Sequence, residues 1–230
     1  MNGSARAKIA SVIVLLLLVA LTAAPQPRGC KPQFAPMETA TSSGADRDIW
    51  RKTEAKDWAG AGWLGWKRDG DALEGVSMAV RDSSSDVDEV HVRSMPEVTF
   101  AVRCVPGLRA GTIQNARVVN HDLLGDGPLN VSLGSLRYEV RLETKDSSAA
   151  DTKVVLAHAG RTQVLYATEG FVDEPHFEIV WAGDLDRDGK LDLIVNLHRK
   201  YSVHPYRLLL STRASRDSLV GEAAVFETGD

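Results

Sequence analysis

The strongest restriction on the fold of this chain is a period-two alternation of apolar and polar residues that recurs in short segments. Residues 98–104 and 137–142 show the alternation most clearly. Successive side chains of a β-strand point to opposite faces, so this pattern predicts strands that bury one face. Further predicted strands of the same character cover residues 75–80, 118–124, 154–158, 163–167, 177–181, 191–197, 206–210 and 219–226.

Turn residues separate these runs, as at 69–71 and 125–128, where Gly, Asp and Pro cluster. About ten short strands with such turns between them are typical of an antiparallel sandwich or barrel. No repeat of about 40 to 60 residues runs through the chain, as a propeller would require. We therefore expect an all-β fold, either a sandwich or a barrel. Only residues 46–59 are suited to a short N-terminal helix.

Residues 1–24 have the three parts of a secretory signal peptide. Arg6 and Lys8 form a basic start, 9–24 is an uncharged apolar run, and that run ends in small residues. The run is shorter than the ~20 apolar residues that a membrane-spanning helix needs. We expect the segment to be removed and the protein to be secreted or periplasmic. Membrane attachment would require that this segment is retained or that Cys30 is lipidated.

The rest of the chain divides into a linker and one domain. Residues 25–45 are rich in Pro, Ser, Thr, Gly and Ala and predict a flexible linker, whereas 46–230 contains the predicted strands. Without the signal segment the chain has 25 basic and 31 acidic residues, a net charge of −6. Nucleic acids and anionic membrane surfaces bind basic proteins, so this balance argues against both as partners.

The two cysteines, Cys30 and Cys104, have two interpretations. In an oxidising compartment they are candidates for a disulfide bond. Alternatively, Cys104 is a small buried hydrophobe, because it continues the apolar alternation of residues 98–104. The sequence leaves both interpretations open.

The distinctive chemistry lies in residues 184–192, here called the aspartate loop, which read DLDRDGKLD between two predicted strands. A chain that curls around Ca²⁺ supplies oxygen ligands from alternate residues, and Gly189 permits the sharp turn that this requires. Without a bound cation, the crowded carboxylates would raise each other's pKa. The alternative interpretation is that the segment is an acidic solvated turn that binds no ion. The expected calcium ligands are Asp184, Asp186, Asp188, the carbonyl of Lys190, and Asp192.

The pattern D-x-D-x-D-G-x-x-D resembles the calcium loops of FG-GAP and VCBS-type repeats, the kind found in integrin propellers. An EF-hand would have a bidentate glutamate at loop position 12, where this chain has Val195. The resemblance covers residues 179–197 and implies that Asp192 closes the calcium shell. The stretch WAGDLDRDGKLDLIVNL is also similar to exported bacterial proteins that carry one such loop. A single copy does not imply a propeller.

Local catalytic motifs are absent from the sequence: it contains no H-x-x-x-H, C-x-x-C or G-x-S-x-G. Trp63 and Trp66 would point to opposite faces of a strand, so we expect at least one in the core rather than a sugar-binding platform. The favoured function is an exported, non-catalytic binding or structural module whose ligand is a protein or a carbohydrate. The alternative is an extracytoplasmic hydrolase with a structural calcium ion.

Overall fold

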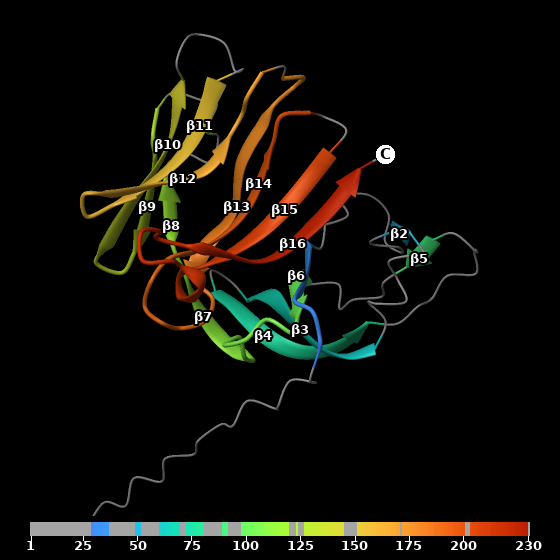
Figure 1. The fold of residues 1–230 in the computed structure, drawn as a ribbon. Coiled ribbons are helices and arrows are strands. Elements are labelled where there is room, and N and C mark those ends of the chain that lie inside the picture. The colour runs from blue at the N-terminus through green and yellow to red at the C-terminus, as the bar shows by residue number, and fades with distance from the viewer. Residues whose placement is uncertain are drawn as a thin grey trace, which may run out of the picture.

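The chain folds into antiparallel β-sheets, as the alternation predicts. In the computed structural model the described residues are 29–36, 49–51, 60–69, 72–80, 89–91, 98–119, 123, 127–144, 151–170, 172–200 and 203–229. Within these residues there are three sheets and no closed barrel, so the all-β prediction is confirmed and the arrangement is consistent with a sandwich (Figure 1). Among them, no helix is long and apolar enough to cross a membrane. The predicted signal peptide, 1–24, lies outside this part of the chain.

The largest sheet has nine strands. In spatial order they are β1 (Gln33–Pro36), β6 (Val98–Arg103), β3 (Gly60–Asp69), β4 (Ala72–Val80), β7 (Gly111–Asn115), β13 (His176–Asp184), β14 (Asp192–His198), β15 (Val203–Leu210) and β16 (Gly221–Gly229). Figure 1 shows β3, β4 and β7 in the lower part of the molecule, with β13 to β16 rising above them. A 3-10 turn, η2 (Ser211–Arg213), follows β15.

The second sheet has five strands and stands beside β13 (Figure 1). In spatial order they are β12 (Arg161–Ala167), β11 (Thr152–His158), β10 (Leu136–Thr144), β9 (Leu129–Leu133) and β8 (Arg117–Val119). A third, two-stranded sheet pairs β2 (Ile49–Arg51) with β5 (Glu89–His91).

Two segments differ from the sequence-based expectation. The helix predicted over 46–59 is wrong at Ile49–Arg51, which forms β2; isoleucine and tryptophan at 49 and 50 favour strands. The remainder of that segment lies outside the described residues. Gln33–Pro36, inside the predicted linker 25–45, forms β1 and pairs with β6. Phe34 in β1 is fully buried, so this part of the segment belongs to the sheet.

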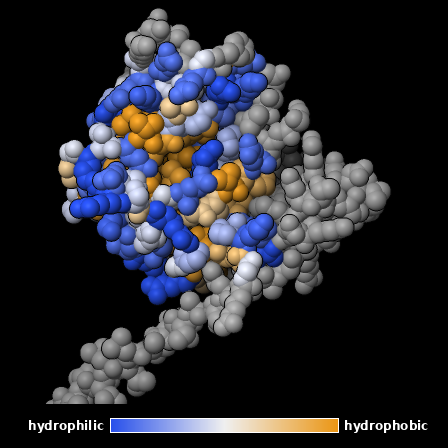
Figure 2. All heavy atoms as spheres, viewed as in Figure 1, coloured by the Kyte–Doolittle hydropathy of each residue, from blue (hydrophilic) through white to orange (hydrophobic). Residues whose placement is uncertain are grey.

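Strand β14 lies at the centre of the fold, because all seven of its residues are buried. Its odd-numbered side chains, such as Leu193 and Val195, pack against the five-stranded sheet. Ile194 points the other way, into a second core that contains Trp66 and Phe100. A continuous apolar run, rather than an alternating one, is expected for a strand covered on both faces. Figure 2 shows apolar residues gathered where the two large sheets meet, with hydrophilic residues around them.

Both tryptophans of β3 are buried, and Trp66 belongs to the second core. Trp63 and Trp66 are 1% and 0% exposed, so neither forms a surface platform. The Trp66 ring stacks on Phe100 with their centroids 5.3 Å apart, and the guanidinium of Arg103 lies 5.0 Å from the centre of the Trp63 ring. A register shift between Gly60 and Trp63 accompanies this placement.

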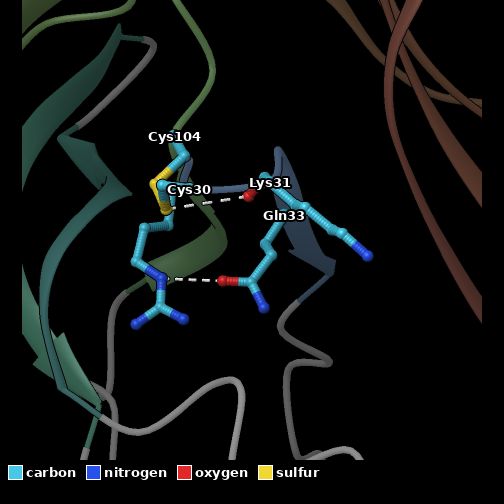
Figure 3. The surroundings of a disulfide bond; sticks show 5 residues. Cys30, Lys31, Gln33 and Cys104 are labelled. Carbon is cyan, nitrogen blue, oxygen red and sulfur yellow. Dashed lines mark hydrogen bonds between the residues drawn. A yellow bond between two sulfur atoms is a disulfide. The ribbon is translucent and has the colours of Figure 1, made fainter. Parts of the chain in front are cut away.

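A disulfide bond joins Cys30, just before β1, to Cys104, just after β6 (Figure 3). The two Cα atoms are 5.8 Å apart, within the range that an unforced bridge allows. Beside it, the Nε of Arg103 donates to Oε1 of Gln33 over 2.7 Å. Cys104 is also 7% exposed, so the half-cystine is part of the buried core as well. The covalent link therefore holds β1 at the edge of the nine-stranded sheet.

Candidate metal centre

The aspartate loop connects β13 to β14, which pair antiparallel from His176–His198 to Gly183–Asp192. Gly183 also pairs with Asn115 of β7, and a Cβ atom there would lie 2.5 Å from the Gln114 carbonyl oxygen. Only glycine therefore lets β7 and β13 approach at the start of the loop. Gly189 has a φ of +80°, a conformation that glycine adopts readily, and it lies in the sharp turn predicted there.

Three of the predicted ligands converge. The side chains of Asp184, Asp186 and Asp188 each offer a carboxylate oxygen, and these oxygens all lie within 4.8 Å of one another. Asp184 is buried, and the Asp188 side chain is 18% exposed. Such a spacing of oxygens is suitable for a divalent cation, since Ca²⁺–oxygen distances are about 2.3 to 2.6 Å. The alternate spacing of these residues produces the convergence.

Backbone N–H groups of the loop hold these carboxylates. Asp188 N donates to Oδ1 of Asp184, and Gly189 N donates to Oδ2 of Asp184, each over 3.0 Å. Lys190 N donates to Oδ1 of Asp188 over 2.8 Å. Hydrogen bonds to carboxylates are stronger than neutral ones, so the loop holds its curled form through its own backbone.

Asp192 has a different position from the other three aspartates. Its Oδ2 accepts from Leu185 N over 2.7 Å and from Asp186 N over 3.3 Å, and its Oδ1 accepts from Ser211 N over 2.7 Å. The residue is fully buried. The predicted closing ligand thus ties both ends of the loop to the turn that follows β15.

Burial and neighbouring negative charges raise the pKa of two loop carboxyl groups, those of Asp192 and Asp186. Burial raises the pKa of Asp192 to about 7, with a further contribution from the charge of Asp186, although the backbone N–H groups oppose the shift. Burial also raises the pKa of Asp186, and the charges of Asp188 and Asp184 add to this. A bound cation would favour the ionised forms and offset both effects.

The side chains of the two basic loop residues take separate directions. The guanidinium of Arg187 donates through Nη2 to the carbonyl of Ala110 over 2.9 Å and so contacts the segment before β7. The ammonium of Lys190 lies 3.4 Å from Oδ2 of Asp188, while most of its side chain is exposed. Arg187 therefore anchors the loop to a neighbouring segment, and Lys190 partly neutralises Asp188.

Sequence reasoning missed three residues that support the loop. Thr212 of η2 donates its hydroxyl hydrogen to Oδ2 of Asp186, and the adjacent Ser211 binds Asp192 through its N–H. Tyr138 of β10 accepts from Leu191 N through its hydroxyl oxygen over 3.3 Å. No local motif marks these residues. Only the pairing of β14 with β15, and the packing of the five-stranded sheet, bring them to the loop.

The chain matches no protein-family model, no curated protein and no solved structure. The likeness to FG-GAP and VCBS-type calcium loops therefore rests on the aspartate pattern alone. The geometry supports a more general statement, namely that three aspartates form a cluster that could hold a metal ion.

Proposed function

We propose that this chain is an exported, non-catalytic β-sandwich module whose aspartate loop binds Ca²⁺. The observation that carries the proposal is the convergence of the carboxylates of Asp184, Asp186 and Asp188 within 4.8 Å. Negatively charged carboxylates at this separation repel one another. A divalent cation coordinated by all three would offset this repulsion.

Calcium is preferred to magnesium because of the kind of ligands present. Ca²⁺ takes six to eight oxygens in flexible geometry, whereas Mg²⁺ keeps several waters and uses one or two carboxylates. The three clustered aspartates, with the Lys190 carbonyl and Asp192 as the further expected ligands, suit the larger ion. For Asp192 to join the shell, one of its oxygens would share the ion with the backbone N–H groups that it already accepts from.

The role of the ion in this proposal is to rigidify a junction. The loop contacts Ala110 through Arg187 and Thr212 through Asp186, so it joins segments from before β7 and after β15. An ion that holds the loop rigid would therefore also hold the segments before β7 and after β15 in place. The module would act outside the cytoplasm on a protein or carbohydrate ligand, in keeping with the signal-like segment 1–24 and the acidic charge. The hydrolase alternative draws no comparable support from the described residues.

Thermal melts with Ca²⁺ and with a chelator test the proposal. For a dissociation constant of about 10⁻⁴ M, typical of extracellular sites, 1 mM Ca²⁺ would add ~1.4 kcal/mol of stability. This corresponds to a rise of roughly 3 to 6 °C in Tm. Asp188→Ala should abolish the rise, because it removes one of the three converging carboxylates.

Asp217→Ala is the matched control, since Asp217 is an exposed aspartate outside the loop. It should keep the full response to Ca²⁺. If the wild-type protein melts at the same temperature in Ca²⁺ and in chelator, the loop is only an acidic turn and the proposal fails. A response of equal size to Mg²⁺ would contradict the assignment of the ion.

A further inference from the structure

A second group of metal-ligating side chains lies at the opposite end of the β13–β14 pair. His176 begins β13, His198 ends β14, and the two stand directly opposite each other in the register, whereas the aspartate loop follows the last pair. Their imidazole rings have centroids 5.3 Å apart and planes at 27°. Zinc–nitrogen bonds are about 2.0 to 2.1 Å long, so two imidazoles at this spacing are close enough to share one ion after small rotations.

Glu178 orients one of these histidines. Its Oε2 lies 3.1 Å from Nε2 of His176, and both side chains are about half exposed. When Nε2–H donates to the carboxylate, the lone pair is on Nδ1, which becomes the available ligand atom. A histidine that binds a metal usually donates its other ring N–H to a carboxylate or carbonyl in this way.

The members of this group that lie on β14 are buried and polar. His198 and Asn196 are 5% and 3% exposed, and Asn196 stands opposite Glu178 in the register. Oδ1 of Asn196 is buried and accepts no hydrogen bond from the described residues. Buried acceptors without a protein donor are usually satisfied by an ordered water or an ion. A polar occupant beside the histidine pair would meet this requirement.

The neighbouring strand also carries a histidine. β14 pairs with β15 as far as Asn196, which is opposite Tyr206, and His204 precedes Tyr206 by two residues on β15. The three adjacent strands β13, β14 and β15 therefore each carry a histidine. Their residues are far apart in sequence, which is why no H-x-x-x-H spacing announces them.

We propose that the pair of His176 and His198 is a binding site for Zn²⁺ or a transition-metal ion of similar preference. His176 and His198 are the ligands, Glu178 positions His176, and water or a further side chain completes the shell. Imidazole nitrogens suit such ions, whereas clustered carboxylates suit Ca²⁺, so the two ends of the β13–β14 pair would select different metals. This inference does not depend on calcium binding at the loop.

Isothermal titration of the full chain with Zn²⁺, in buffer that contains excess Ca²⁺, tests the site. We expect one Zn²⁺ ion per chain. His176→Ala, on the exposed side of the pair, should weaken zinc affinity by about tenfold or more, and Glu178→Gln should weaken it by less. His158→Ala is the matched control, because His158 also stacks on a ring, that of Tyr138, but lies on β11. It should bind zinc as the wild type does.

Three outcomes would overturn the proposal. These are no zinc binding by the wild type, unchanged affinity in His176→Ala, or loss of zinc binding in Asp186→Asn, which would place the ion at the aspartate loop. Melts without metal check that His176→Ala is folded. Should it unfold, Co²⁺ added to the wild type decides: the imidazole NMR signals of His176 and His198 must broaden before those of His158.

Discussion

The nine-stranded sheet is secured in two regions by unlike chemistry. At its β1 edge, the Cys30–Cys104 bond attaches β1 to the end of β6. Between β13 and β14, the aspartate loop is held by carboxylates that accept backbone N–H groups. A covalent link acts largely by restricting the unfolded chain and is indifferent to pH and cations. Buried carboxylates are indifferent to reductants but respond to protons and ions. The stability of the nine-stranded sheet should therefore respond to reductants in one region and to protons and cations in the other.

The largest expected effect comes from breaking the covalent region. The bond spans 74 residues of sequence, for which the chain-entropy relation gives a loss of about 4 kcal/mol on removal. Cys30→Ser, with a free-thiol assay and chemical denaturation, measures it. Reductant should lower the stability of the wild type and have no effect on the variant. Equal stability of the wild type with and without reductant would contradict the prediction.

Gly183→Ala should have the next largest effect and should act on the loop region alone. The added Cβ would lie 2.4 Å from Cζ2 of Trp181 and 2.5 Å from the Gln114 carbonyl oxygen. Overpacking of this kind costs about 1 to 3 kcal/mol. Gly189→Ala is a useful comparison, since nothing lies within 4 Å of its Cβ position and only its positive φ is unfavourable, at about 1 to 2 kcal/mol. A Gly183→Ala protein as stable as the wild type would show that β7 is not held close.

A change of pH should alter stability through the loop region and not through the disulfide, and we expect this effect to be smaller than the two above. The pKa of Asp192 is about 7 in the folded protein against an ordinary value of 3.8, so the folded state binds the proton more tightly. Its contribution to stability is present below about pH 4 and is lost as the pH rises through 7. In chelator, stability should fall by roughly 1 to 2 kcal/mol between pH 5.5 and 7.

Asp192→Asn should flatten this pH dependence, whereas Cys30→Ser should retain it. Excess Ca²⁺ should also oppose it, because the ion favours the ionised carboxylate. Denaturation curves at several pH values provide the measurement. A stability that rises from pH 5.5 to 7 in chelator would give the opposite sign and contradict the burial argument.

Period-two alternation was sufficient to predict the all-β fold, because it records which faces are buried. Residues 137–142 and 177–181 fall within β10 and β13 for this reason. Strands with few apolar residues escaped it: β7 has only Ile113 buried, and its place in the sheet depends on Gly183 and Gly75 across the pairing. Sheet order is equally hidden, since β7 and β13 are far apart in the chain.

The sequence likewise predicted only part of the candidate site. Alternate spacing and one glycine predicted the convergence of Asp184, Asp186 and Asp188, because a curled backbone points alternate residues inward. It did not predict that Asp192 would bind the N–H of Ser211, nor that Thr212 would reach Asp186. Those contacts depend on how β15 ends, which the loop sequence does not encode.

The disulfide also determines how the molecule would respond to a mechanical load. A pulling force applied before Cys30 would pass through the sulfur bridge to Cys104 and leave the intervening residues outside the load path. Strands β1, β3, β4 and β6 would be shielded from extension, since all of them lie between the two cysteines. At about 3.3 to 3.6 Å per residue, the bridge would hide roughly 250 Å of contour length until it is reduced.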